Sequence, residues 1–97
     1  DPEREVRKTI ARRLPAFALA RLLDDRDAEV RRIVAERALP EHAARLLDDN
    51  DWLVRLAAVG RAPLDALASR LEDPEPEVRQ AARERLQQSH STPENSE

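Results

Sequence analysis

The dipeptide Val-Arg returns at a constant spacing of 24 residues along the chain. Its copies are Val6-Arg7, Val30-Arg31, Val54-Arg55 and Val78-Arg79. A second arginine keeps the same spacing, at Arg13, Arg37, Arg61 and Arg85. Repetition at a fixed period of this kind is typical of solenoids, in which no unit buries its apolar face without its neighbours. The repeats span residues 1–24, 25–48 and 49–72, followed by a partial copy at 73–87.

Each unit carries the signals for an α-helix, a corner and a second, shorter helix. The first helix follows an acidic residue, which favours the N-cap or faces the positive end of the helix dipole: Glu3, Asp27, Asp51 or Glu75. The helix then runs to a proline that disfavours helical conformation in the residue before it: Pro15, Pro40 or Pro63. About eight residues follow before an acidic corner, a length that suits a 3₁₀ or very short α-helix.

The apolar residues of the first helix fall on one face when they are placed at about 100° per residue. In the second unit this face holds Val30, Ile33, Val34 and Ala38, while Glu29, Arg32 and Glu36 lie opposite. The other units obey the same division. The pattern predicts an all-α solenoid whose core lies between stacked helices.

The composition of the chain excludes several classes of protein function. The 97 residues suit a single domain, and the net charge of −3 gives no bulk attraction to nucleic acid or to an anionic membrane. Cysteine is absent, which excludes a disulfide, a thiolate metal site and a cysteine nucleophile within this sequence. The sequence contains neither a signal peptide nor a run of about 18 apolar residues. We therefore expect a cytoplasmic protein that does not enter a membrane.

Both ends of the sequence depart from the repeat. Residues 88–97 are polar, contain Pro93 and lack the short-helix pattern, so we expect a disordered tail. The given sequence starts directly with a repeat at Asp1, without the polar terminal unit that caps most solenoids. The expectation is a segment of a longer repeat protein.

The 24-residue period, the opening Asp-x-x-x-x-Val-Arg and the proline ahead of a Leu-Leu-Asp ending resemble the leucine-rich repeat variant (LRV) family. HEAT-like repeats share a similar helix but have a longer period. The LRV resemblance covers residues 1 to about 87 and implies α-helices and 3₁₀ helices that alternate in a right-handed superhelix. Some members of the family carry a cysteine-ligated [4Fe-4S] cluster in a small N-terminal domain. This chain has no cysteine, so we expect no cofactor here, and a cluster would need residues outside this sequence.

The recurring arginines allow two interpretations. One arginine per repeat can track a phosphate backbone, as in a nucleic-acid-binding solenoid. However, the helical wheel places Arg31 and Arg37 within the apolar arc, away from the solvent face. We therefore expect the guanidinium groups to bond to acidic corners and helix-end carbonyls of neighbouring units. This structural ladder comprises Arg7, Arg31, Arg55, Arg79, Arg13, Arg37, Arg61 and Arg85, with Asp25, Asp49 and Asp73.

The third unit is more apolar than the others. Trp52, Leu53 and Leu56 occupy positions that are mostly polar or charged in the other repeats. Residues four apart are neighbours on a helix, and tryptophan is enriched at binding hot spots, so one interpretation is a partner-binding patch. The other is that short helices, the tail or preceding repeats cover these residues. Phe17 is a second candidate for partner binding, but it can also face the place of a preceding repeat.

The sequence offers no catalytic constellation. His42 and His90 are its only histidines, and neither has a patterned serine or second metal ligand near it. The acidic corners lack the glycine and glutamate spacing of an EF-hand loop. We therefore predict a non-enzymatic scaffold that binds another protein and holds no metal. The alternatives are a nucleic-acid-binding or phosphate-binding solenoid and the repeat region of an iron–sulfur protein.

Overall fold

The computed structural model describes residues 2–91, and this part of the chain is helical, with no strand. In chain order the elements are α1 (Pro2–Arg13), η1 (Ala16–Leu22), α2 (Ala28–Arg37), α3 (Pro40–Arg45), η2 (Leu46–Asp48), α4 (Trp52–Val59), η3 (Leu64–Ala66), η4 (Ala68–Glu72) and α5 (Pro76–Ser91), where η marks a 3₁₀ helix. The structure confirms the predicted all-α solenoid of alternating longer and shorter helices.

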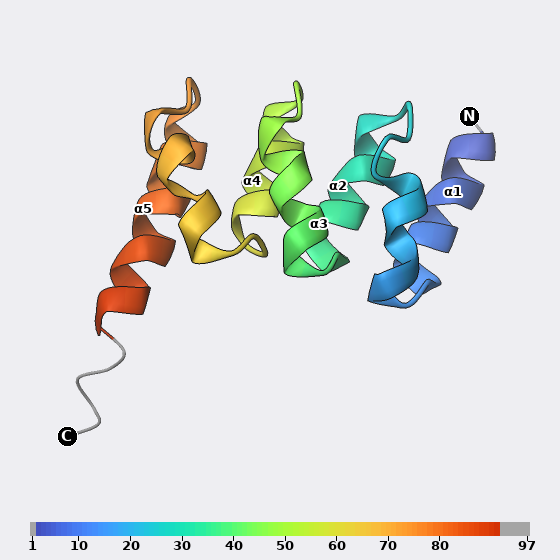
Figure 1. The fold of residues 1–97 in the computed structure, drawn as a ribbon. Helices are drawn as coiled ribbons and strands as arrows, with labels where there is room; N and C mark the ends of the chain where they lie inside the picture. The colour runs from blue at the N-terminus through green and yellow to red at the C-terminus, as the bar shows by residue number, and fades with distance from the viewer. Residues whose placement is uncertain (1, 92–97) are drawn as a thin grey trace.

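The helices form two layers along an elongated molecule (Figure 1). The layer of longer helices contains α1, α2, α4 and α5, and the other layer contains the short helices (Figure 1). Within the first layer, α2 packs between α1 and α4, and α4 packs between α2 and α5. Each unit is therefore supported mainly by its neighbours in sequence, as expected for a solenoid.

Aspartates begin the central helices as the sequence predicts. The side chain of Asp27 accepts a hydrogen bond from the backbone N–H of Glu29 at 2.8 Å, and Asp51 accepts one from Leu53 at 2.9 Å. Both aspartates have extended backbone conformations, which is the geometry of an N-cap. These bonds satisfy N–H groups that have no partner within the first turn of the helix.

The position of the proline and the form of the second helix differ together between units. Pro15 and Pro63 lie one residue before their helices, and 3₁₀ helices follow. Pro40 lies at the start of α3, where its missing N–H costs nothing, and Leu39 takes the cap position. The second unit has a six-residue α-helix before η2, whereas after their prolines the first and third units have only 3₁₀ helices.

The core fills the space between the two layers. The valines of the later Val-Arg pairs lie there, and Val30, Val54 and Val78 are each 0% exposed. The short helices contribute Leu19 and Leu67 from the opposite side. Alanine occupies many of the remaining core positions, which lets helices approach closely but removes little apolar area from water. Each buried leucine therefore accounts for a large share of the hydrophobic stabilisation.

The boundary predicted for the C-terminal tail is wrong. The sequence places residues 88–97 in a disordered segment, but α5 continues to Ser91. The reason is that Gln87 and Gln88 stand where the other units have a helix-ending proline, so nothing stops the helix at the usual place. The rest of the predicted tail, 92–97, lies outside the described residues.

We predict that Leu67→Ala lowers the free energy of unfolding by about 2–5 kcal/mol, because it opens a cavity in a fully buried site. Leu64→Ala is the matched control, since Leu64 lies in the same layer but is 38% exposed. Urea unfolding followed through the single tryptophan, Trp52, measures both variants. Equal losses would contradict the assignment of Leu67 to the core.

Candidate functional site

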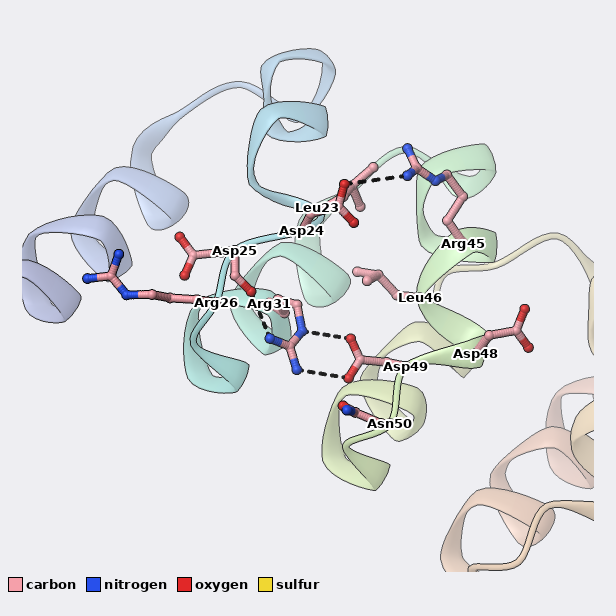
Figure 2. Close-up of a pocket in the computed structure, with 10 residues that line it drawn as sticks. All are labelled: Leu23, Asp24, Asp25, Arg26, Arg31, Arg45, Leu46, Asp48, Asp49 and Asn50. Atoms are coloured by element: carbon pink, nitrogen blue, oxygen red, sulfur yellow. Dashed lines mark hydrogen bonds and ion pairs between the residues drawn. The ribbon is translucent and has the colours of Figure 1, made fainter.

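Arg31 joins the second unit to the third (Figure 2). Its Nε donates to Asp49 Oδ2 at 2.7 Å, and its Nη2 donates to Asp49 Oδ1 at 3.1 Å. The remaining branch, Nη1, donates to the backbone carbonyl of Asp25 at 2.7 Å. Paired bonds of this kind fix both the distance and the orientation of the two groups. One guanidinium thus holds the corner of its own unit and the opening aspartate of the next.

The same arrangement recurs along the first arginine column. Arg55 donates through Nε to Asp73 Oδ2 at 2.9 Å and through Nη1 to the carbonyl of Asp49 at 2.8 Å. Arg7 donates through Nε to Asp25 Oδ2 at 2.8 Å. Arg79 donates to the carbonyl of Asp73 at 2.7 Å but, within residues 2–91, has no aspartate ahead of it.

The opening aspartates also shape the corners. Oδ1 of Asp49 accepts a hydrogen bond from the backbone N–H of Asp51 at 2.9 Å, and Asp51 in turn caps α4. Asp25 makes the corresponding bond at 3.0 Å, and Asp73 makes it at 2.9 Å. Each carboxylate therefore couples the start of one helix to an arginine of the preceding unit.

Asp73 is the most enclosed of these carboxylates, with only 1% of its surface exposed. Burial opposes its charge, but hydrogen bonds from Arg55 and from the backbone of Glu75, with the charges of Arg55 and Arg70, outweigh this effect. The pKa of Asp73 consequently lies below the usual carboxyl value. The Arg31 guanidinium has the complementary shift: its hydrogen bond to Asp49 raises its pKa despite burial.

The second arginine column reaches in the opposite direction. Arg37 Nη1 donates to the carbonyls of Ala11 and Leu14, each at 2.7 Å, at the end of the preceding longer helix. Arg61 Nε and Nη2 donate to Ala38, and Arg85 Nη1 donates to Val59 and Ala62. These carbonyls lie at helix ends and have few partners within their own helix. Arg13 is exposed and makes no such bond to the described residues.

Arg70 belongs to the same network, although the repeat pattern did not identify it. Its Nη1 donates to Asp73 Oδ2 at 2.9 Å, and its Nη2 lies 3.7 Å from Asp48. The first two units carry a basic residue near the end of the short segment, at Arg21 and Arg45, and this pattern could have identified Arg70. The third unit shifts this residue by one position, so the column is broken in the sequence.

Trp52, Leu53 and Leu56, which we call the Trp52 strip, all lie on α4. Trp52 and Leu56 are partly buried and pack against the core. Leu53 is 38% exposed and lines an open groove with charged residues of the first two units: Arg4, Asp27, Glu29 and Arg32. The strip thus presents a small apolar surface with a charged border.

Phe17 lies apart from the Trp52 strip, in the layer of short helices on η1. It is 72% exposed. Glu41 and Asp65 hold the corresponding positions in later units and are also exposed, although each of those units has a preceding neighbour. The position therefore faces solvent in every unit that has it, and a preceding repeat would not be expected to cover Phe17.

The described residues contain no group of three or more histidine, aspartate or glutamate side chains arranged to hold a metal ion. With no cysteine in the sequence, the donors that a [4Fe-4S] cluster requires are absent from this chain. Nδ1 of His42 has no hydrogen-bond partner. Within residues 2–91 no helix has both the length and the apolar character needed to cross a membrane.

We predict that Arg31→Ala lowers the free energy of unfolding by about 3 kcal/mol, because it leaves the enclosed carboxylate of Asp49 without its charged partner. Arg32→Ala, at the adjacent and exposed position, is the control and should change stability little. Thermal or urea unfolding measures both. If the two variants are equally stable, the ladder does not stabilise the stack.

The lowered pKa of Asp73 predicts a loss of stability in acid. Ionised Asp73 stabilises the fold above the unfolded pKa of about 3.9, and this contribution is lost as the pH falls towards the lower folded pKa. Unfolding free energies measured between about pH 6 and pH 2.5 should therefore fall less steeply for Asp73→Asn than for the unchanged chain. Asp65→Asn, at an exposed position, should leave the slope unaltered. Parallel curves for Asp73→Asn and the unchanged chain would contradict the prediction.

Comparison with known proteins agrees with this geometry. The family model described as "Leucine rich repeat variant" matches residues 4–27, the length of one repeat. A solved structure described as a leucine-rich repeat variant with a novel repetitive structural motif is 50% identical, with a TM-score of 0.80. The match covers 89% of this chain and 36% of that one, and no curated protein matches. The sequence identity, the shared fold and the matching repeat show that the chain belongs to the leucine-rich repeat variant family.

Proposed function

We propose that this chain is a non-enzymatic repeat scaffold that binds another protein through the Trp52 strip. The observation that carries the proposal is the exposure of Leu53 beside Trp52 and Leu56 on one helix. The four units stack in the same way but differ in the residues at the positions of the Trp52 strip. Residues that are not used for stacking are the ones that are available to contact a partner.

The composition of the strip supports this proposal. Leu53 stands where the other units have Glu5, Glu29 and Glu77, and Leu56 stands where they have Lys8, Arg32 and Gln80. Neither leucine is needed for the repeat, because the other units form the same helix with polar residues there. An apolar centre beside charged neighbours is the usual arrangement of a protein–protein interface. Phe17 would provide a separate contact in the other layer.

The alternative of phosphate or nucleic-acid binding receives less support. With the exception of Arg13, the arginines of both columns donate hydrogen bonds to acceptors of this chain, which leaves fewer donors for phosphate. A mobility-shift titration with duplex DNA at two salt concentrations distinguishes the alternatives. Binding that weakens steeply with salt would favour the nucleic-acid function.

The direct test is photo-crosslinking in extracts of the cells that express the protein. A photoreactive residue in place of Leu53 should form a defined adduct with a partner, while the same residue in place of Leu64 should not, because the two sites are equally exposed but lie in different layers. Trp52 is the only tryptophan and no tyrosine is present, so its emission can report binding of the purified partner. Adducts of identical composition from both sites would oppose the proposal.

We predict that Leu53→Asp weakens binding of that partner by roughly tenfold or more, the effect of losing about 1.4 kcal/mol at an interface. Leu64→Asp is the matched control, since both leucines are 38% exposed. Both variants should keep nearly the melting temperature of the unchanged chain. Unchanged affinity of Leu53→Asp, measured through Trp52 fluorescence, would refute a role for the Trp52 strip.

A further inference from the structure

The outer surface of the longer-helix layer changes its chemistry from unit to unit. Two positions, four residues apart on each of these helices, show the change. They hold Lys8 and Arg12 in the first unit, Arg32 and Glu36 in the second, Leu56 and Gly60 in the third, and Gln80 and Glu84 in the fourth. These positions are therefore cationic in the first unit, mixed in the second, apolar beside the Trp52 strip, and polar or acidic in the fourth.

Stacking between units does not cover this surface. Arg32 and Glu36 lie on α2, which packs between α1 and α4, yet each of the two side chains is 51% exposed. On the same helix, Val30 and Val34 are fully buried by the neighbouring units. The exposure of the outer surface is thus found in a unit that has a neighbour on either side.

Two adjoining hollows connect the cationic part of this surface to the Trp52 strip. The first, of about 260 Å³, is lined by Lys8, Arg12, Glu29, Arg32, Ile33 and Glu36. The second, of about 400 Å³, is the groove that Leu53 lines together with Arg4, Asp27, Ala28, Glu29, Arg32 and Asp51. Because Glu29 and Arg32 line both hollows, we treat them as one surface and call it the outer groove.

Three carboxylates of the outer groove are already engaged within the chain. Asp27 and Asp51 accept hydrogen bonds from backbone N–H groups at the starts of their helices, at 2.8 and 2.9 Å. Oε1 of Glu29 accepts a hydrogen bond from Nζ of Lys8 at 2.8 Å. This bond is the main reason that the pKa of Glu29 is lowered. The groove therefore offers few open acceptors to a cationic partner.

The arginines of the outer groove are less engaged. Arg12 is exposed and makes no hydrogen bond or ion pair with other residues of the described range, 2–91. Nε of Arg32 lies 3.6 Å from Glu36 Oε2, which is longer than a hydrogen bond. Nε of Arg4 is buried and has no hydrogen-bond partner. Each guanidinium carries five N–H donors, so the groove has open donors that carboxylates of a partner can satisfy.

The extent of the cationic region favours a protein segment over nucleic acid. A phosphate backbone carries charge at a regular spacing, so binding it calls for cations along the whole surface. Here the positions of Lys8 and Arg12 become Leu56 and Gly60 in the third unit. The exposed side chain of Leu53 suits an aliphatic side chain of a partner and not a phosphate.

We propose that the outer groove binds an acidic segment of a partner protein in which aspartate or glutamate residues lie next to aliphatic residues. This inference rests on the function proposed above for the Trp52 strip and names the chemistry of its partner. The acidic residues accept hydrogen bonds from Arg12 and Arg32, and the aliphatic residues pack against Leu53. Neighbouring helices pack roughly 8–10 Å apart, so α1 to α4 spans roughly 20 Å, a distance that about six extended residues cover.

The test is a selection on the 97-residue chain from a displayed library of random peptides of about 12 residues, twice that span. The recovered peptides should be enriched in aspartate, glutamate and aliphatic residues. A recovered peptide, titrated through Trp52 emission, should bind Arg32→Glu about tenfold more weakly, because the reversed charge repels its carboxylates. Arg12→Glu should have a similar effect. Arg21→Glu is the matched control, since Arg21 is an exposed arginine in the other layer.

All three charge variants should keep nearly the melting temperature of the unchanged chain, because each replaces an exposed side chain. Failure to recover any peptide, or recovery of peptides without an excess of acidic residues, would overturn the proposal. Equal affinities of Arg32→Glu and the unchanged chain would also overturn it. Binding of duplex DNA that is lost in Arg32→Glu would assign the outer groove to nucleic acid instead.

Leu53→Ser separates this inference from the function proposed above. Binding that is lost in Leu53→Ser but unchanged in Arg32→Glu would mean that the Trp52 strip binds a partner of different chemistry. Binding that is unchanged in both variants would count against the Trp52 strip as well as against the acidic partner. Binding weakened in both, and unchanged in Arg21→Glu, is the expected result.

Discussion

The stack depends on the bond between an arginine of one unit and the aspartate that opens the next. A unit of one α-helix and one short helix buries too little apolar surface to be stable alone. The Arg31–Asp49 pair joins two such units, and the same carboxylate holds the corner from which α4 starts. The beginning of each helix is therefore tied to the position of its neighbour, so local and tertiary structure form together.

The two arginine columns act in opposite directions. Arg31 reaches forward to the next unit, whereas Arg37 reaches back to the end of the preceding longer helix. Together they hold the second and third units at both the beginning and the end of the longer helix. The two ends of the described solenoid also differ: the α1 end exposes the apolar side chains of Val6 and Ile10, whereas α5 carries mostly polar exposed residues.

The residues that repeat in this chain differ from those that we propose for recognition. The residues that repeat pack between units, cap helices or form hydrogen bonds between units. Some of the positions that vary, such as that of Leu53, lie on the outer surface, where a change does not disturb the period. Leu53 is of this second kind, since glutamate serves equally well for folding in the other units. Information about a partner is therefore expected where the repeat is broken.

The sequence by itself determined the period, the helix caps at Asp27 and Asp51, the core valines and the family, because each follows from a local preference or a regular spacing. The tertiary structure decided which acceptor each arginine finds, since Asp49 and Ala11 come close to their arginines only when units stack. It also decided the exposure of Val6, whose side chain is identical to that of the buried Val30. The two valines differ only in whether a preceding helix lies against them.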